Sequence, residues 1–302
     1  MVIKMERKFT LSCCSTVDLP YSYMESRHIP VLFYNYVVAG QEYVDDMGRD
    51  PQALPRFYEL LETGKLPSTS QINVARYLDF FEEQLQKGDL LHIAFTSGQS
   101  GSVNNAYLAA AELREKYPQR KIVVVDSLCS SSGYGMLVDF VADMADSGAT
   151  IEECEQWLLD NRNKIHHQFF SSNMTQFRRT GRVSGAAAAV ATVLNICPIM
   201  RLDAAGAIKA YDKVRGKKKA VEVTVEEMAK HAQNGEAYDN KCYICHSQCM
   251  EDANMLKDAV EARFPHLVGK IRFCDIGTII GSHSGPGTVA VFFLGDERPV
   301  MA

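Results

Sequence analysis

Four apolar runs in the first half of the chain have the pattern of β-strands that are buried on both faces. Between them, apolar residues recur at three- and four-residue steps across 102–117 and 133–145, a spacing that predicts helices with one buried face. Alternating strands and helices are typical of a parallel sheet covered by helices. The four predicted strands are 8–14, 29–38, 89–95 and 121–127.

The pattern changes after a helix predicted over 151–165. A helix of small residues is predicted over 184–196, and then two strand-like runs flank an Ala205-Gly206 turn, which is a hairpin signal. We therefore expect two closely packed domains, 1–165 and 166–302. The other predicted elements are a helix from Ala220, a strand at Cys242, a helix from Ala253 to Phe264, and strands over 269–276 and 288–295.

Composition and charge exclude several classes of protein. The 302 residues have a formal net charge of −5, which disfavours nucleic-acid binding because such binding needs clustered Lys and Arg. No window approaches the roughly 18 consecutive apolar residues of a membrane span, and the first residues lack the apolar core of a signal peptide. We expect a soluble, cytoplasmic protein.

The nine cysteines fit reduced thiols better than a disulfide framework. The segment "KCYICHSQCM" admits a zinc site made by Cys242, Cys245, His246 and Cys249. The second ligand pair of a structural zinc site is missing, however, and the same segment has the pattern of a short buried strand. We favour the strand, and we predict no metal site.

Two polar loops follow predicted strands and precede predicted helices. In "FTSGQSGS", Ser97 and its neighbouring hydroxyls can hydrogen-bond a ligand, while Gly98 lets a ligand approach the backbone. In "DSLCSSSGYG" the same design recurs from Asp126, with Ser127 next to it. Ligands of open α/β sheets collect at such loops, where helix N-termini favour anions. The pattern predicts a carboxylate or anion site, and the alternative is a simple helix cap with a turn.

Serine catalysis is the main enzymatic alternative. Ser97 or Ser100 would be the nucleophile, and His283, in the glycine-rich segment "GSHSGPG" that we interpret as a loop, would be the base. The nucleophile elbow requires G-x-S-x-G, and here Ser102 stands where the second glycine belongs. The chain also lacks the P-loop, kinase and H-E-x-x-H motifs. These absences favour binding over catalysis.

Taken in order, the polar segments resemble those of the DegV family of bacterial fatty-acid-binding proteins. The matching segments run nearly end to end: "STVDLP", "GQEYVDD", "STSQ", "FTSGQSGSVNNA", "VVDSLCSSSGYGMLV", "TGRVSG", "LNICPIMRLDAAGAIKAYDKVRGKKKA" and "IGTIIGSHSGPGTVAVFF". The resemblance implies a two-domain α/β fold with a Rossmann-like parallel sheet in the first domain and a smaller mixed-sheet second domain. It also implies that an acyl chain is buried between and within the domains.

The family's site residues transfer to this chain by motif. The resemblance implies that Thr69, Ser97 and His283 hold the carboxylate of a long-chain fatty acid, with Arg182 close by. It further implies that a separate fatty acid kinase, docking at Arg215 and Lys213, phosphorylates that carboxylate to an acyl phosphate. The protein itself would need no metal or cofactor, and transient contact with a membrane would fit this role. The ligand-binding residues expected in full are Thr69, Ser97, Gly98, Ser127, Arg182, Gly281 and His283.

Two positions depart from the family pattern. Cys14 and Ser15 stand where the family usually has an Asp-Ser pair, and Thr180 begins the "TGR" segment where "GGR" is common. Neither departure changes Thr69, Ser97 or His283. A regulatory lipid sensor with the same pocket and no kinase partner is the remaining alternative function.

Overall fold

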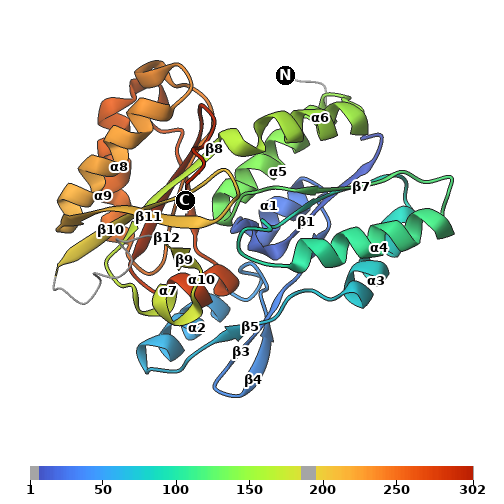
Figure 1. The fold of residues 1–302 in the computed structure, drawn as a ribbon, viewed down its shortest axis with the longest axis horizontal. Helices are drawn as coiled ribbons and strands as arrows, with labels where there is room; N and C mark the ends of the chain where they lie inside the picture. The colour runs from blue at the N-terminus through green and yellow to red at the C-terminus, as the bar shows by residue number, and fades with distance from the viewer. Residues whose placement is uncertain (1–6, 185–194, 302) are drawn as a thin grey trace.

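The predicted parallel strands form one four-stranded sheet in the computed structural model, which describes residues 7–184 and 195–301 (Figure 1). The order is β2-β1-β6-β7, and every neighbouring pair is parallel. All five residues of β6 are buried, as expected for a strand covered on both faces. The strands are β1 (Thr10–Cys14), β2 (Val31–Leu32), β6 (Leu90–Ala94) and β7 (Ile122–Asp126).

The predicted strand over 29–38 is wrong as a single element. Only Val31–Leu32 joins the parallel sheet, and the rest enters a separate antiparallel sheet of order β4-β3-β5. Val37 is exposed, so the second part of the run is covered on one face only, a distinction that its unbroken apolar sequence hides. The strands of this small sheet are β3 (Asn35–Val38), β4 (Gln41–Val44) and β5 (Ser68–Thr69).

Two helices in the first half begin at residues whose side chains cap them. The Asn73 side chain accepts a hydrogen bond from the backbone of Arg76 at the start of α3, and Thr150 and Glu153 form a capping box at the start of α6. The helices predicted over 102–117, 133–145 and 151–165 are confirmed as α4, α5 and α6. The helices are α1 (Tyr21–Ser26), α2 (Ala53–Glu62), α3 (Val74–Leu85), α4 (Ser102–Lys116), α5 (Ser131–Asp146) and α6 (Ile151–Asn161), with the 3-10 turns η1 (Ser15–Val17) and η2 (Arg162–Lys164).

The second half contributes a mixed seven-stranded sheet of order β13-β12-β14-β8-β10-β11-β9. β12 with β13 and β11 with β9 are parallel pairs, and the other pairs are antiparallel. The predicted hairpin is confirmed, and Gly206 in its turn has a φ of 74°, which favours glycine. The strands are β8 (Ile165–Ser171), β9 (Val183–Ser184), β10 (Ile196–Leu202), β11 (Ile208–Arg215), β12 (Cys242–His246), β13 (Arg272–Asp275) and β14 (Thr288–Leu294).

Helices α8 and α9 cover one face of this sheet (Figure 1). They begin three residues before the expected Ala220 and Ala253. Most of the helix predicted over 184–196 lies outside the described residues. The segment around His283, interpreted as a loop, is the short helix α10. The helices are α7 (Thr175–Thr180), α8 (Lys217–His231), α9 (Met250–Arg263) and α10 (Thr278–Ser284), with the 3-10 turns η4 (Gly235–Ala237) and η5 (Pro265–Leu267).

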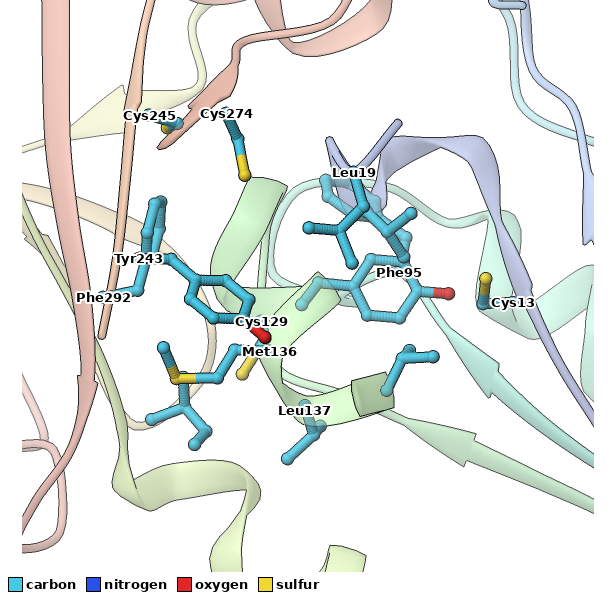
Figure 2. Packing of buried hydrophobic residues seen from close by; sticks show 14 of the residues in the cluster. Cys13, Leu19, Phe95, Cys129, Met136, Leu137, Tyr243, Cys245, Cys274 and Phe292 are labelled. Carbon is cyan, nitrogen blue, oxygen red and sulfur yellow. The ribbon is translucent and has the colours of Figure 1, made fainter. Parts of the chain in front are cut away.

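Helix α5 lies between the two larger sheets. It packs against β8, β12 and β14 of the seven-stranded sheet, and its side chains join residues of both sheets in one hydrophobic cluster (Figure 2). The expected boundary between 165 and 166 falls at the first two residues of β8, where the chain enters the second sheet. The exact division of the domains stays a prediction.

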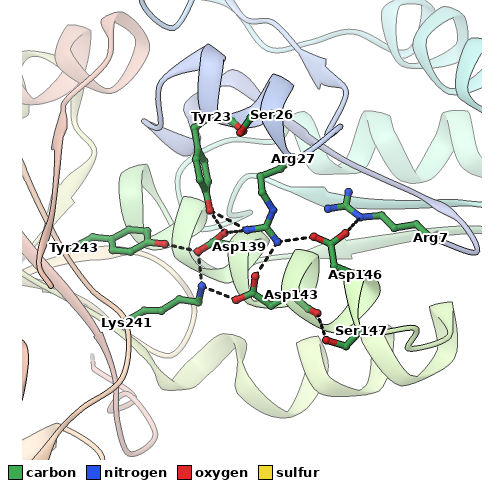
Figure 3. Close-up of polar contacts among 10 residues, drawn as sticks. All are labelled: Arg7, Tyr23, Ser26, Arg27, Asp139, Asp143, Asp146, Ser147, Lys241 and Tyr243. Carbon is green, nitrogen blue, oxygen red and sulfur yellow. Dashed lines mark hydrogen bonds and ion pairs between the residues drawn. The ribbon is translucent and has the colours of Figure 1, made fainter. Parts of the chain in front are cut away.

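A buried charge cluster joins the two halves beside α5 (Figure 3). Asp139 of α5 accepts hydrogen bonds from Arg27, which follows α1, at 2.6 Å, from Lys241 at 2.5 Å and from Tyr243 of β12 at 2.6 Å, and also from Tyr23. Burial by itself raises the pKa of Asp139, but Lys241 and the hydroxyl donors outweigh it and hold the pKa below its usual value. The ion pairs that Asp139 makes with Arg27 and Lys241 therefore connect the first half of the chain to the second.

Candidate functional site

A cavity of about 330 Å³ lies between the two larger sheets, beside the N-terminal end of α5. This volume is at the lower end of the roughly 300–1,000 Å³ that is usual for small-molecule sites. Phe95 and Tyr34 border the cavity from the first half of the chain, and the seven-stranded sheet with its adjoining segments, α7 and α10 supply apolar side chains from the second half. The apolar residues of the second half are Phe169, Phe177, Leu202, Ile208, Ile276, Ile279, Ile280, Ala290 and Phe292. Such a wall suits a hydrocarbon ligand.

Thr69 and His283 meet at this cavity from opposite ends of the chain. Thr69 is the last residue of β5, which pairs with β3, and His283 is on α10, which packs against both strands. Oγ1 of Thr69 lies 2.8 Å from Nε2 of His283. The two side chains are thus joined by a hydrogen bond on the wall of an otherwise largely apolar cavity.

His283 is neutral at neutral pH. Burial lowers its pKa to about 4, and the guanidinium groups of Arg182 and Arg179 act in the same direction. Its second ring nitrogen, Nδ1, is buried and has no hydrogen-bond partner among the described residues. A ligand oxygen at that nitrogen would satisfy the imidazole and favour its protonation.

Ser97 and Arg182 border the same cavity. Ser97 follows β6, and the carboxylate of Asp126 fixes its loop by accepting a hydrogen bond from the Ser97 backbone at 3.1 Å. Arg182 follows α7, is exposed, and donates a hydrogen bond to the backbone oxygen of Thr180. The cavity therefore has a hydroxyl on one side and a cation at its solvent-facing part.

Further polar atoms on the cavity wall lack partners. Oγ1 of Thr16 and Oγ of Ser284 are buried without a hydrogen bond to any described residue. Buried polar groups are normally hydrogen-bonded, because leaving one unpaired costs about 1–3 kcal/mol. The hydroxyl of Tyr34, which also borders the cavity, is buried without a partner among the described residues as well. Three such hydroxyls and the free nitrogen of His283 point to a ligand with a polar end.

His167 of β8 also borders the cavity, although it lies in none of the motifs that mark the other site residues. Its Nδ1 donates to the backbone oxygen of Ile165 at 2.9 Å, and its Nε2 accepts from the backbone N–H of Ser130 at 3.0 Å. Burial, followed by the nearby Arg298, places its pKa well below the usual value. This neutral histidine fixes the start of α5. Its alternation with Phe169 along one strand was the available signal.

Comparison with known proteins places this fold in a family. A family model described as "Uncharacterised protein, DegV family" matches residues 13–296. The chain belongs to the DegV family. It is similar to a DegV domain-containing protein of Clostridium perfringens, with 36% identity over 294 residues that cover 97% of this chain and 99% of the relative. The resemblance found in the sequence motifs is confirmed.

Solved DegV structures share the fold. A fatty-acid-binding DegV family protein of Thermus thermophilus has a TM-score of 0.82 and 25% identity, and the match covers 96% of this chain and 100% of that one. The fatty acid kinase B3 protein of Streptococcus pneumoniae, solved with linoleic acid, has a TM-score of 0.81 and 22% identity over the same shares. The expected α/β fold with a parallel sheet and a mixed sheet is confirmed.

Three residues expected at the ligand site of this DegV protein do not border the cavity. A Cβ on Gly98 would lie 2.4 Å from the backbone of Gly206, so Gly98 permits the close approach of the β10–β11 turn. A Cβ on Gly281 would lie 2.7 Å from the hydroxyl of Tyr58. Ser127 both donates to and accepts from the backbone of Cys129 at 3.1 Å. These contacts are structural, and a ligand role for the three residues stays a prediction.

The basic residues expected to dock a kinase lie on a different part of this DegV fold. Lys213 and Arg215 are exposed on β11, and no hydrogen bond or ion pair engages either side chain within the described part of the chain. Ile208, at the other end of β11, borders the cavity. Seven residues of strand span about 23 Å, so Arg215 is well outside the cavity. This position is compatible with a partner surface.

The strand interpretation of "KCYICHSQCM" is confirmed. Cys242–His246 is β12, and all of its residues are buried. Successive side chains of a strand face opposite sides, which separates Cys242 from Cys245. These residues and Cys249 do not form a converging ligand group within the described chain.

Among the residues that the structure describes, no helix has the length and the apolar character that a membrane span requires.

Proposed function

We propose that this DegV protein binds a long-chain fatty acid, with the carboxylate at Thr69, Ser97 and His283 and with Arg182 nearby. The observation that supports this proposal is the hydrogen-bonded Thr69–His283 pair, with its free imidazole nitrogen, on the wall of a cavity that has both apolar and polar lining residues. The fatty-acid-binding relative from Thermus thermophilus has the same fold at 25% identity.

The energetics favour an acyl chain over a small acid. Burying a methylene group contributes about 0.8 kcal/mol, so a chain of roughly sixteen carbons supplies on the order of 10 kcal/mol before the costs of binding. The carboxylate needs hydrogen-bond donors, since burying it unpaired costs several kcal/mol. The hydroxyls and the imidazole on the cavity wall would supply those donors.

The second part of the proposal is that the protein is a non-catalytic carrier that presents the carboxylate to a fatty acid kinase in the cytoplasm. The similarity in fold to the fatty acid kinase B3 protein suggests this role. All nine cysteines are free thiols, as a reducing compartment permits. The exposed Lys213 and Arg215 on β11 would contact the kinase, and phosphorylation of the carboxylate would yield an acyl phosphate.

A serine-dependent hydrolase or acyltransferase is the second candidate, because Ser97 and Ser100 border the same cavity as His283. The hydrogen bond of His283 in the structure is to Thr69. A general base must lie within hydrogen-bond reach of its serine, and the Thr69 contact does not provide that. The geometry therefore favours binding.

Native mass spectrometry of the purified protein tests the ligand class directly. A co-purifying mass of a long-chain fatty acid is the expected result. After delipidation, Thr69→Val should weaken fatty acid binding about tenfold to a hundredfold, because it removes a donor and keeps the side-chain volume. Thr63→Val, at the exposed end of α2, is the matched control. A protein that binds no fatty acid, or equal affinity in both variants, would refute the proposal.

A further inference from the structure

His166, His231 and Asp296 converge on the face of the seven-stranded sheet that lies away from the lipid cavity. His166 is the second residue of β8, His231 ends α8, and Asp296 follows β14. Because side chains alternate along a strand, His166 faces α8 while His167, the next residue, faces the cavity. The cluster is thus separate from the proposed fatty acid site.

The three side chains present ligand atoms to a common point. Oδ1 of Asp296 lies 3.0 Å from Nε2 of His166 and 3.0 Å from Nδ1 of His231, and the three ligand atoms all lie within 4.8 Å of one another. Ligand atoms around a tetrahedral zinc ion are roughly 3.4 Å apart, because zinc–nitrogen bonds are about 2.0–2.1 Å long. The two 3.0 Å separations are close to this spacing. Because an ion lies in the plane of each imidazole that binds it, the rings of His166 and His231, now 20° from parallel, must turn relative to each other.

The backbone holds these residues in place before any ion binds. The N–H of Asp296 donates to the backbone oxygen of His231 at 3.0 Å, and the N–H of Gly295 donates to Lys164 at 2.8 Å. A Cβ on Gly295 would lie 2.2 Å from the His231 oxygen and 2.9 Å from Cδ2 of His166. Only glycine permits this close approach, so the segments that bear the three ligands are tightly joined.

Ring stacking and a second carboxylate orient the histidines. The His166 ring is stacked on Phe293 at 4.9 Å and on His231 at 5.0 Å, measured between ring centroids. Oε2 of Glu227 lies 3.7 Å from Nε2 of His231. Without an ion, Nδ1 of His231 donates a hydrogen bond to the Asp296 carboxylate at 3.0 Å. When an ion binds Nδ1, the hydrogen moves to Nε2, where the Glu227 carboxylate stabilises it, as outer carboxylates do at metal sites.

We propose that His166, His231 and Asp296 bind a divalent transition-metal ion of the zinc class, with water completing the coordination. Two imidazoles and a carboxylate are a ligand set that zinc accepts, and Asp296 is 58% exposed, which leaves an open path for the ion and for water. The ion would join β8, α8 and the segment after β14.

The sequence offered no signal for this site, because Asp296 is 65 positions from His231 and 130 from His166.

In the metal-free protein, Nε2 of His166 lies 2.9 Å from the backbone oxygen of Asp296, a contact that requires a hydrogen on that nitrogen. Metal binding moves this hydrogen to Nδ1 without changing the charge of the ring. The rival interpretation is a permanent hydrogen-bonded cluster that binds no ion.

Cobalt titration of the untagged, chelator-treated and reduced full-length protein distinguishes a metal site from a permanent hydrogen-bonded cluster. We expect one Co²⁺ per chain, with ligand-field bands in the visible spectrum. The intense near-ultraviolet bands of thiolate ligation should be absent, which would show that none of the nine cysteines binds the ion. Zn²⁺ should displace Co²⁺ and raise the melting temperature. Asp296→Asn and His231→Ala should each weaken Co²⁺ binding roughly tenfold or more.

Asp258→Asn and His266→Ala are the matched controls, because both residues are exposed and distant in sequence from the cluster. They should leave Co²⁺ affinity unchanged. Asp296 is largely exposed, so its replacement leaves the fold intact, which circular dichroism verifies. Absence of Co²⁺ binding, thiolate bands, or equal affinity in the wild type and Asp296→Asn would overturn the proposal. A Zn²⁺-induced rise in melting temperature that persists in Asp296→Asn would place the ion elsewhere and overturn it as well.

Discussion

Oγ1 of Thr69 lies 2.8 Å from Nε2 of His283, although 214 positions separate the two residues in the chain. A strand of the small sheet supplies the first residue and the short helix α10 supplies the second. This pair brings a polar group to the wall of the cavity between the two large sheets.

Replacing His283 by Ala should weaken fatty acid binding and leave it measurable. The change removes a hydrogen-bond donor to the carboxylate, at a cost of about 1–3 kcal/mol, or roughly tenfold to a hundredfold in affinity. The apolar wall still supplies most of the favourable free energy. Affinity and ester hydrolysis should both be measured, with His266→Ala as a control. Unchanged affinity together with lost hydrolysis would favour the hydrolase instead.

Ligand binding should raise the pKa of His283. In the free protein burial holds this pKa at about 4, and a nearby carboxylate favours the protonated ring. Fatty acid affinity should therefore increase as the pH falls through the bound-state pKa toward the free-state value of about 4. Histidine NMR titrations with and without ligand would measure the shift. An identical titration in both states would mean that the carboxylate lies elsewhere.

The same depressed pKa predicts how the stability of the free protein depends on pH. The unfolded chain takes up the proton near pH 6.5, whereas folded His283 takes it up only near pH 4. The contribution of His283 to the free energy of unfolding is therefore full above about pH 6.5 and is lost as the pH falls toward 4. Chemical denaturation of the wild type and of His283→Gln across this pH range should show that the variant loses less unfolding free energy as the pH falls.

Charge reversal at Arg215 should separate kinase docking from ligand binding. Arg215 is exposed and lies about 23 Å along β11 from the cavity, so Arg215→Glu should impair kinase-dependent acyl phosphate formation while fatty acid affinity stays unchanged. Lys270→Glu, an exposed change before β13 at the other edge of the same sheet, is the control. Equal loss of both activities would place Arg215 in the ligand site.

Removing Asp139 should destabilise the protein strongly. Asp139→Ala removes the buried carboxylate that Arg27 and Lys241 share and leaves them with the more exposed Asp143. Breaking a buried pair costs about 3–5 kcal/mol. Asp143→Ala, at a neighbouring site where the side chain is 51% exposed, should cost less than about 1 kcal/mol. Urea denaturation measures the loss of unfolding free energy in both variants. Similar midpoints for the two variants would show that the cluster adds little to stability.

The sequence predicted the parts of this fold in which local pattern and burial agree. The apolar run 89–95 became β6, buried on both faces, and the Ala205-Gly206 turn joined β10 to β11. The glycine-rich segment around His283 was interpreted as a loop, yet it forms α10, because packing against α7 and the small sheet outweighs its low helix propensity.

The candidate site was predictable only where a motif marks it. Thr69, Ser97, Arg182 and His283 lie in recognisable segments, and all four border one cavity. His167 has no motif, and its role depends on contacts with Ser130 that are distant in sequence. Gly98 was expected to make room for a ligand, whereas it makes room for Gly206. Sequence shows that space is needed at a glycine, and only the structure shows what fills it.

Phe95 borders the cavity from the first half of the chain, and Phe169 and Phe292 border it from the second. The shape of the cavity is therefore a joint property of both halves. If one half were exchanged between two DegV proteins, the chimaera would have a cavity of a third shape, matching neither parent. Selectivity for acyl chains in this family would then evolve by paired changes across the boundary between the halves, and a single substitution on one side would seldom transfer one parent's preference to the other.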